Sequence, residues 1–298
     1  MFDVIIVGAG PAGLSAALIL GRCRRTILVC DTGQHRNAVS HALHGFLTRD
    51  GSNPTEFLQF GREQLQPYET VELRHIEVTD VTYTGTHFEV MLADGTNATC
   101  RKLLLATGVV DTVPSVEGME TYYGRGVYHC PYCDAWEVRD QPLIVYGADK
   151  SAQELALELT VWSHNLLLCT DGPAQLDEKA RKRLSHNGIQ LCEEHITRLE
   201  GKDGHLARVV LEHGTVLPCE ALFFWTDGQQ RSNFAAKLGS DFTRKGAVRT
   251  DEYEGTNVPG LYVAGDASRR PQLVIVAAAE GAEAAFAINT ALLKEDLL

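Results

Sequence analysis

The sequence has little positive charge, no long apolar run and few cysteines. Lysine and arginine number 27 against 39 aspartates and glutamates, which gives a formal net charge of −12. Affinity for nucleic acid depends on basic side chains that neutralise phosphates, so this balance argues against a nucleic-acid partner. No apolar stretch approaches the roughly 18 residues that cross a bilayer, and no basic segment opens the chain. We therefore expect a cytoplasmic protein with no membrane partner.

Cysteine is also too scarce to form a disulfide-stabilised scaffold, with eight residues in a chain of 298. Six cysteines stand alone at irregular spacings, which indicates buried thiols, and the remaining two form one C-x-x-C pattern, at Cys130 and Cys133. Glycine far outnumbers proline, 27 to 10, as is typical of a globular chain with many tight turns.

Two segments repeat the order strand, tight turn, helix, strand. In the first, residues 2–7 are a continuous apolar run, a glycine-rich turn follows, residues 12–22 have helical spacing, and residues 26–30 are a second apolar run. A weaker copy begins at residue 143, and alternating stretches at 87–95 and 207–214 indicate antiparallel hairpins. The sequence predicts an α/β fold with two Rossmann-like, three-layer nucleotide-binding domains.

The first turn, GAGPAG at residues 8–13, fits the dinucleotide pattern G-x-G-x-x-G. Gly8 permits the turn, Gly10 leaves room for a pyrophosphate, and Gly13 lets the helix pack close to the strand. Asp31 ends the next strand, where an acid can bind a ribose hydroxyl pair. The alternative is a glycine-rich turn that binds no ligand, but the strand, helix and acid are all in place, which favours dinucleotide binding.

A second candidate for the same cofactor lies near the end of the chain, where an apolar strand delivers Gly265 and Asp266 before the last helix. The glycine allows close approach of a ligand, and the aspartate can accept a hydrogen bond from a ribityl hydroxyl. By itself, Asp266 is equally well explained as an ordinary helix cap. Together with the first turn, it indicates FAD.

The reactive candidate is the segment CPYCD at residues 130–134. Adjacent thiols near a helix start have lowered pKa values and exchange disulfides through thiolate attack, and Asp134 can move the proton that this exchange requires. A zinc site is less favoured because Cys130, Cys133 and the neighbouring His129 supply three ligands, whereas a closed site needs four. An inert thiol pair is the remaining alternative.

These motifs, in this order, resemble the low-molecular-weight thioredoxin reductases over essentially the whole chain. The resemblance rests on GAGPAG, LLATG at 104–108, CPYCD, and YVAGDAS near the end. It implies a discontinuous FAD-binding domain at residues 1–113 and 229–298. The second domain, at residues 114–228, would be an inserted pyridine-nucleotide-type domain that carries the C-x-x-C. It also implies a homodimer.

The resemblance implies roles for individual residues. Cys133 is the sulfur that faces the flavin, Cys130 exchanges with the external partner, and Asp134 is the acid-base group. The positions that match family contacts to FAD are Gly10, Ala12, Gly13, Asp31, Val78, Thr107, Asp266, Gln272 and Leu273.

The second copy departs from the family pattern where NADPH should bind. Asp149 stands in the turn where backbone should meet a pyrophosphate, and Asp171 stands where the family has a basic cluster for the 2′-phosphate. A carboxylate opposite a phosphate is repulsive, so NADPH is disfavoured at both ends, although Lys150 could partly offset Asp149.

A second departure is the stretch Arg36-Asn37-Ala38 followed by His41 and His44. It resembles the related thiol oxidases that close disulfides in dithiol natural products such as gliotoxin and holomycin. Arg36, Asn37 and His44 are therefore added to the candidate cofactor site. For His44, a loop histidine satisfied by backbone is the favoured alternative.

The leading hypothesis is an FAD-dependent dithiol-disulfide oxidoreductase that does not use NADPH, acting as a thiol oxidase on a small molecule or a thioredoxin-like protein. In the alternative, ferredoxin, NADH or a second flavin reduces the enzyme, which then reduces thioredoxin. A flavin-binding regulatory protein is the alternative from another class, against which the intact CPYCD argues.

Overall fold

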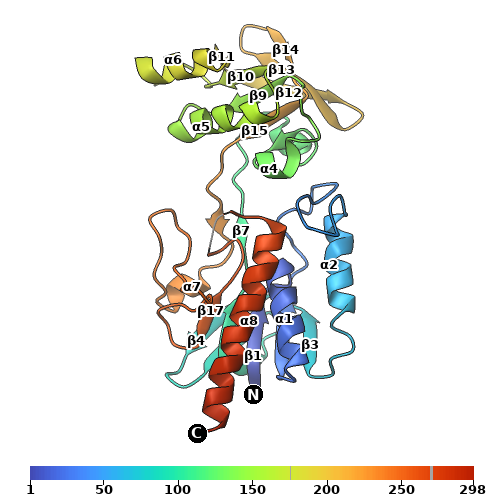
Figure 1. The fold of residues 1–298 in the computed structure, drawn as a ribbon, viewed down its shortest axis with the longest axis vertical. Helices are drawn as coiled ribbons and strands as arrows, with labels where there is room; N and C mark the ends of the chain where they lie inside the picture. Colours follow the sequence, from blue (N-terminus) through green and yellow to red (C-terminus); the bar gives the residue numbers. More distant parts are fainter. Residues whose placement is uncertain (175, 269–270) are drawn as a thin grey trace. The chain divides into compact units, whose positions relative to one another are not determined.

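The chain folds as two separate units in a computed structural model, which describes residues 1–174, 176–268 and 271–298. Unit 1 comprises Met1–Ala38, Gly45–Val110 and Gly228–Leu298, and unit 2 comprises Val39–His44 and Asp111–Asp227 (Figure 1). Unit 2 is thus inserted in the sequence of unit 1. The short segment Val39–His44 groups with unit 2, whereas the sequence analysis placed it in the FAD-binding part.

Unit 1 is built on a parallel sheet in which the first strand of the chain lies centrally. The parallel strands, in spatial order, are β3 (Val71–His75), β2 (Ile27–Asp31), β1 (Phe2–Val7), β6 (Asn97–Leu105) and β17 (Leu261–Val263). The strands β4 (Val78–Tyr83) and β5 (Phe88–Leu92) form an antiparallel hairpin that pairs with the beginning of β6. The short strands β7 (Val109–Val110) and β16 (Gln229–Gln230) pair with each other where the chain leaves and re-enters the unit.

Alternate side chains of β1 divide the core of unit 1 into two layers. Val4 and Ile6 pack with the buried faces of two long helices, while Ile5 and Val7 pack with the antiparallel hairpin. This arrangement gives the order helices, parallel sheet, antiparallel strands. The helices of the unit are α1 (Pro11–Arg22), α2 (Pro54–Glu63), α7 (Phe234–Lys237) and α8 (Val274–Asp296).

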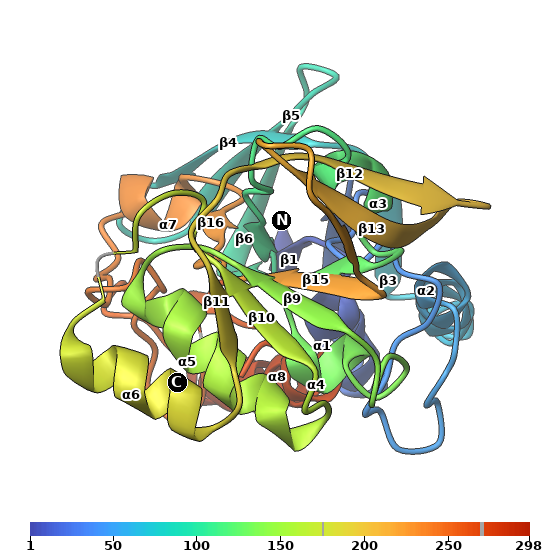
Figure 2. The ribbon, with the colours of Figure 1, turned by 90° about the horizontal axis from the view of Figure 1, so that it is seen from above.

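Unit 2 repeats the same layers around a second parallel sheet. Its strands, in spatial order, are β11 (Gln190–Cys192), β10 (Leu166–Cys169), β9 (Leu143–Tyr146), β15 (Ala221–Phe224) and β8 (Val127–Tyr128). The remaining elements of the unit are α3 (Met119–Tyr122), α4 (Pro131–Asp134), α5 (Lys150–Glu158), the 3-10 turn Leu159–Val161, α6 (Glu178–His186), β12 (Ile196–Lys202), β13 (His205–Leu211) and β14 (Val216–Pro218). Helices α5 and α6 pack on one face of the parallel sheet, and the antiparallel strands β12 to β14 pack on the other (Figure 2).

The structure confirms the predicted fold class, two Rossmann-like units of three layers each. The expectation that no apolar stretch approaches the length of a membrane span was wrong. Helix α8 has 23 residues and a mean hydropathy of 1.3 over its most apolar window, so by length and composition it could cross a bilayer. In the structure, one face of α8 packs against α1 in the core of unit 1, with Ala284, Ala285 and Ile288 fully buried.

Helices α1 and α8 approach each other closely enough that their backbones meet (Figure 1). A Cβ atom on Gly281 of α8 would lie 2.0 Å from the carbonyl oxygen of Ala12 in α1. The contact therefore requires glycine, and it fixes the helix that follows the first glycine-rich turn.

We predict that Gly281→Ala destabilises unit 1, although alanine is the better helix former. Helix propensity alone would stabilise the variant by roughly 0.5–1 kcal/mol, whereas the clash with Ala12 costs about 1–3 kcal/mol. Denaturant unfolding measures the difference. The control is Ala279→Gly at an exposed position of α8, which isolates the propensity term. A Gly281→Ala variant that is more stable than the wild type would contradict this account of the contact.

Candidate active site

The turn between β1 and α1 is packed so tightly that it needs its glycines. Gly8 has a φ of +103°, and a Cβ there would lie 2.4 Å from the carbonyl oxygen of Ala106. A Cβ on Gly13 would lie 1.9 Å from the carbonyl oxygen of Gly8. Gly10 differs, because a Cβ there meets nothing within 4 Å among the described residues.

The N-terminus of α1 is open to a ligand. Gly10 is its N-cap, and in the described part of the chain no side chain caps the helix. The first N–H groups of a helix lack partners within the helix and attract anions, so a pyrophosphate fits this position. The residues present therefore fit the FAD that the sequence predicts.

Asp31 lies beside this turn at the end of β2. Its carboxylate accepts hydrogen bonds from the N–H groups of Ala9, at 3.0 Å, and Gly33, at 3.1 Å. Arg62 of α2 donates to the same carboxylate at 3.0 Å. The sequence analysis missed Arg62, because nothing in the local pattern of α2 shows that this arginine reaches the end of β2.

A second group of side chains joins the beginning of α8 to the segment after β2. One guanidinium nitrogen of Arg36 donates to Asp266 and to Gln272, each at 2.8 Å. Gln272 also donates to the carbonyl oxygen of Asp266 at 3.1 Å. The structure thus brings together three candidate residues that are far apart in the sequence.

Glu280 supports this group from within α8 and was also missed. Its side chain is buried and accepts the N–H of Gly265 at 2.7 Å, which holds the turn that presents Asp266. A single glutamate in an alanine-rich helix gives little signal in the sequence.

The other predicted FAD contacts also lie in unit 1. Ala12 is buried in α1, Val78 is buried at the start of β4, and Leu273 is the N-cap of α8. Thr107 accepts a hydrogen bond from Ser232 at 3.3 Å, and Asn37 follows Arg36 in the same turn. Their contacts to FAD stay predictions.

We predict that Gly10→Val folds but loses FAD. A Cβ at this position meets nothing within 4 Å among the described residues, so the valine side chain would enter the space expected for the pyrophosphate and displace it. The ratio of flavin to protein absorbance after purification measures binding, and circular dichroism checks the fold. A folded variant that retains stoichiometric FAD would show that the pyrophosphate does not lie at Gly10.

The cysteine pair lies in unit 2, on the short helix α4. Cys130 is the N-cap of α4, and its sulfur forms a disulfide with Cys133 in the same turn. Asp134 is the last residue of α4 and is partly buried. Desolvation by the surrounding protein, assisted by the negative charge of Glu137 and opposed by His44, raises the pKa of Asp134 to about 7. A carboxyl group with this pKa can both donate and accept a proton near neutral pH.

The structure places His44 in unit 2, in the segment Val39–His44. Its Nε2 atom forms an ion pair with Glu137 at 3.5 Å. Contact of His44 with a cofactor stays a prediction. Glu137 was missed in the sequence analysis because it follows CPYCD without belonging to the motif.

A second polar group precedes Cys130 in the chain. The Tyr123 hydroxyl donates to the carboxylate of Asp111 at 3.1 Å and lies 2.9 Å from Nδ1 of His129. His129 therefore has side-chain partners of its own. Among the described residues, no three His, Cys, Asp or Glu side chains are grouped as a metal site.

In unit 2, the two acidic residues at the expected nucleotide positions are hydrogen-bonded within the chain. Asp149 is the N-cap of α5 and accepts the N–H of Ala152 at 2.9 Å. Asp171 follows β10 and accepts hydrogen bonds from the Tyr146 hydroxyl, at 2.7 Å, and the N–H of Ile196, at 3.2 Å. Both positions at which a dinucleotide phosphate would be expected therefore hold hydrogen-bonded acids.

Comparisons with known proteins identify the family. Residues 2–281 match the pyridine nucleotide-disulphide oxidoreductase family. The chain belongs to this family. It is an FAD-dependent oxidoreductase of the thioredoxin reductase type, which confirms the family and the cofactor that the sequence predicted.

One curated relative and two solved structures match over almost their full length. Thioredoxin reductase sirT of Leptosphaeria maculans is 31% identical, and the match covers 100% of this chain and 96% of the relative. The crystal structure of HlmI has a TM-score of 0.96 at 35% identity, covering 99% of this chain and 94% of HlmI. A putative thioredoxin reductase TrxB from Bacillus anthracis has a TM-score of 0.94 at 33% identity, covering 99% and 100% of the two chains.

We predict that Asp134→Asn slows disulfide exchange without unfolding the protein. Loss of acid-base catalysis costs about 10²–10⁴-fold in rate. Because the pKa of Asp134 is about 7, the wild-type rate should change slope near pH 7, and the variant should lack this inflection. Stopped-flow reduction by dithiothreitol across pH 5.5–9 measures both effects.

The matched control is Asp140→Asn, which removes an exposed carboxylate six residues later. This variant should keep both the wild-type rate and the inflection. A loss below about threefold in Asp134→Asn, small beside the 10²–10⁴-fold of general acid-base catalysis, would mean that Asp134 serves only as a residue of α4.

Proposed function

We propose that this enzyme is a thiol oxidase that does not use NADPH. A substrate dithiol would reduce the Cys130–Cys133 disulfide, and FAD, when bound, would supply the redox chemistry by which the electron pair leaves the cysteines for oxygen or another acceptor. The observation that carries the proposal is the pair of carboxylates, Asp149 and Asp171, in the nucleotide region of unit 2.

The turns that precede α1 and α5 support the proposal because they differ at the N-cap of the helix. In unit 1 the N-cap of the helix after the turn is Gly10, no side chain of the described residues caps the helix, and a Cβ on Gly10 would meet nothing within 4 Å among them. In unit 2 the equivalent helix begins at Asp149, whose carboxylate already accepts one of these N–H groups. A phosphate at α5 would have to displace this cap and would meet its negative charge.

Asp171 adds a second obstacle at the position expected for the 2′-phosphate. Its carboxylate is fixed by Tyr146 and by the backbone of Ile196, and His195 lies 3.2 Å from it. Burial, followed by the hydrogen bond to Asp171, raises the pKa of Tyr146, so the phenol stays a donor to the carboxylate. NADH is less strongly excluded, because an acid at this position can bind an unmodified ribose.

The residues of unit 2 supply the dithiol chemistry. A substrate thiolate attacks Cys130 and releases Cys133, and the second substrate thiolate then attacks the mixed disulfide. The products are a substrate disulfide and two cysteine thiols, so two electrons move from substrate to enzyme. Asp134, with a pKa near neutral, can protonate the sulfur that leaves.

A second candidate function is reduction of a thioredoxin-like protein. Several relatives, including sirT, bear the name thioredoxin reductase, which favours this function. This function would need another electron donor than NADPH, such as ferredoxin, NADH or a second flavin. Both directions use Cys130, Cys133 and Asp134.

Anaerobic reduction of the purified protein distinguishes the electron donors. We expect dithiothreitol to bleach the flavin absorbance, and NADPH at the same concentration to leave it unchanged, with NADH tested separately. The control is Cys133→Ser, which should block bleaching by the dithiol. Rapid and complete bleaching by NADPH would overturn the proposal and make the protein a pyridine-nucleotide-dependent reductase.

A further inference from the structure

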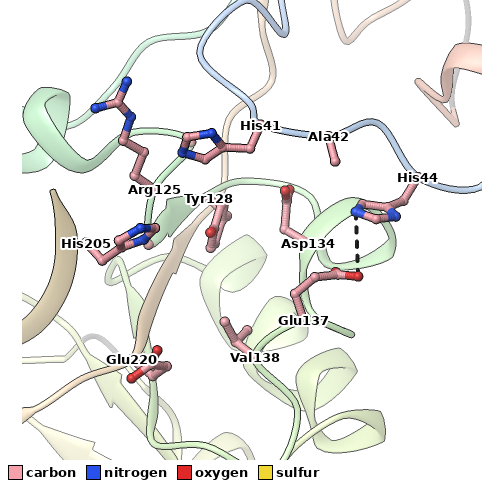
Figure 3. Close-up of a pocket in the computed structure, with 12 residues that line it drawn as sticks. His41, Ala42, His44, Arg125, Tyr128, Asp134, Glu137, Val138, His205 and Glu220 are labelled. Carbon is pink, nitrogen blue, oxygen red and sulfur yellow. Dashed lines mark ion pairs between the residues drawn. The ribbon is translucent and has the colours of Figure 1, made fainter. Parts of the chain in front are cut away.

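A cavity of about 290 Å³ lies within unit 2 against Asp134 (Figure 3). A water molecule needs about 10–15 Å³ by this kind of measure, so the cavity has room for several. Of the residues that make up the redox centre, Asp134 lines the cavity, and Cys130 and Cys133 are not among its described lining residues. The other lining groups that can carry charge are His41, His44, Arg125, Tyr128, Glu137, His205 and Glu220.

Two of these groups lie at the same side of the cavity as Asp134. Figure 3 shows His44 and Glu137 beside it, with their ion pair of 3.5 Å, and His41, Arg125 and His205 on the other side. The side chain of His44 is 23% exposed and that of Glu137 is 43% exposed. The pair is therefore partly accessible to solvent, Glu137 more so than His44.

The redox cycle requires a path for protons at this position. When the Cys130–Cys133 disulfide re-forms, the two thiols lose two electrons, which pass to FAD, and two protons, which must leave the sulfurs. If oxygen is the final acceptor, two protons are taken up from solvent as it becomes hydrogen peroxide. Asp134 can hold one proton at a time, so it must release each proton before it accepts the next.

We propose that Asp134 exchanges its proton with solvent through this cavity, and that His44 and Glu137 are the relay residues. Histidine is suited to this role because its unperturbed pKa of about 6.5 lets it carry a proton near neutral pH. The inference rests on the proposed thiol oxidase. It concerns the half-reaction in which a dithiol reduces the enzyme, and this half-reaction does not involve oxygen.

Removal of the histidine tests the relay directly. His44→Ala should slow anaerobic reduction by dithiothreitol at least about tenfold, within the range of lost proton transfer. Added imidazole should restore the rate, because it fits the space vacated in the cavity. The solvent deuterium isotope effect should rise in the variant and fall again with imidazole. The control, His213→Ala, removes an exposed histidine outside the cavity and should change none of these.

Glu137→Gln gives a second readout that keeps the shape of the side chain. Glu137 raises the pKa of Asp134, and His44 lowers it. The inflection near pH 7 should therefore move to lower pH in Glu137→Gln and to higher pH in His44→Ala. These shifts report the charges of both residues at Asp134, and the isotope effect distinguishes a relay from charge alone.

The relay is refuted if His44→Ala folds and its flavin is reduced by dithiothreitol at the wild-type rate. It is also refuted if the rate falls but imidazole does not restore it and the isotope effect does not change. Should His44→Ala fail to fold, an unchanged inflection and isotope effect in Glu137→Gln would refute it equally. Since dithiothreitol reduction needs no oxygen, failure of the oxidase assignment would leave these outcomes intact. A failed relay would likewise leave that assignment standing.

Discussion

The chemistry of this protein depends on which groups hold the N-terminal N–H groups of two helices. Each unit has a parallel strand that leads through a glycine turn into a helix, and such a helix end attracts either a phosphate or a carboxylate. In unit 1, Gly10 leaves that position open, and the close contact of Gly281 with Ala12 fixes the helix behind it. In unit 2, Asp149 occupies the position with its own side chain. One fold therefore gives an open helix N-terminus in one unit and a capped one in the other.

In the proposed thiol oxidase, the carboxylates of Asp149 and Asp171 disfavour NADPH, which leaves dithiols as the electron source. Proton transfer at Asp134 is then part of each turnover. Partial burial and the charge of Glu137 place the pKa of Asp134 at about 7, where both protonation states are populated. The same burial means that its proton needs a route to solvent, and the cavity beside His44 and Glu137 meets that need.

Local sequence patterns predicted the elements whose conformation depends on neighbouring residues in the chain. The apolar run at residues 2–7 became β1, and the glycine turn and helical spacing after it became α1. Partners that come from distant parts of the chain could not be predicted this way. Arg62 reaches Asp31 from α2, and Glu280 reaches Gly265 from α8, and neither stands in a recognisable motif.

The placement of the segment Val39–His44 also depends on contacts between residues far apart in the sequence, which local patterns do not predict. Its sequence neighbours belong to unit 1, but it packs with unit 2, which brings His44 to Glu137. The apolar length of helix α8 was underestimated for a different reason. The helix contains many alanines, yet one stretch of it reaches the mean hydropathy of a membrane span. Its buried small residues serve close packing on α1 instead.

The central claim is that dithiols alone drive the enzyme, and the most direct measurement is the stoichiometry of oxygen consumption. With dithiothreitol and air, and with no pyridine nucleotide present, the account predicts catalytic oxygen uptake with one hydrogen peroxide formed for each dithiol oxidised. Addition of NADPH should leave the rate unchanged. Absence of uptake with the dithiol, together with uptake that begins only when NADPH is added, would contradict it.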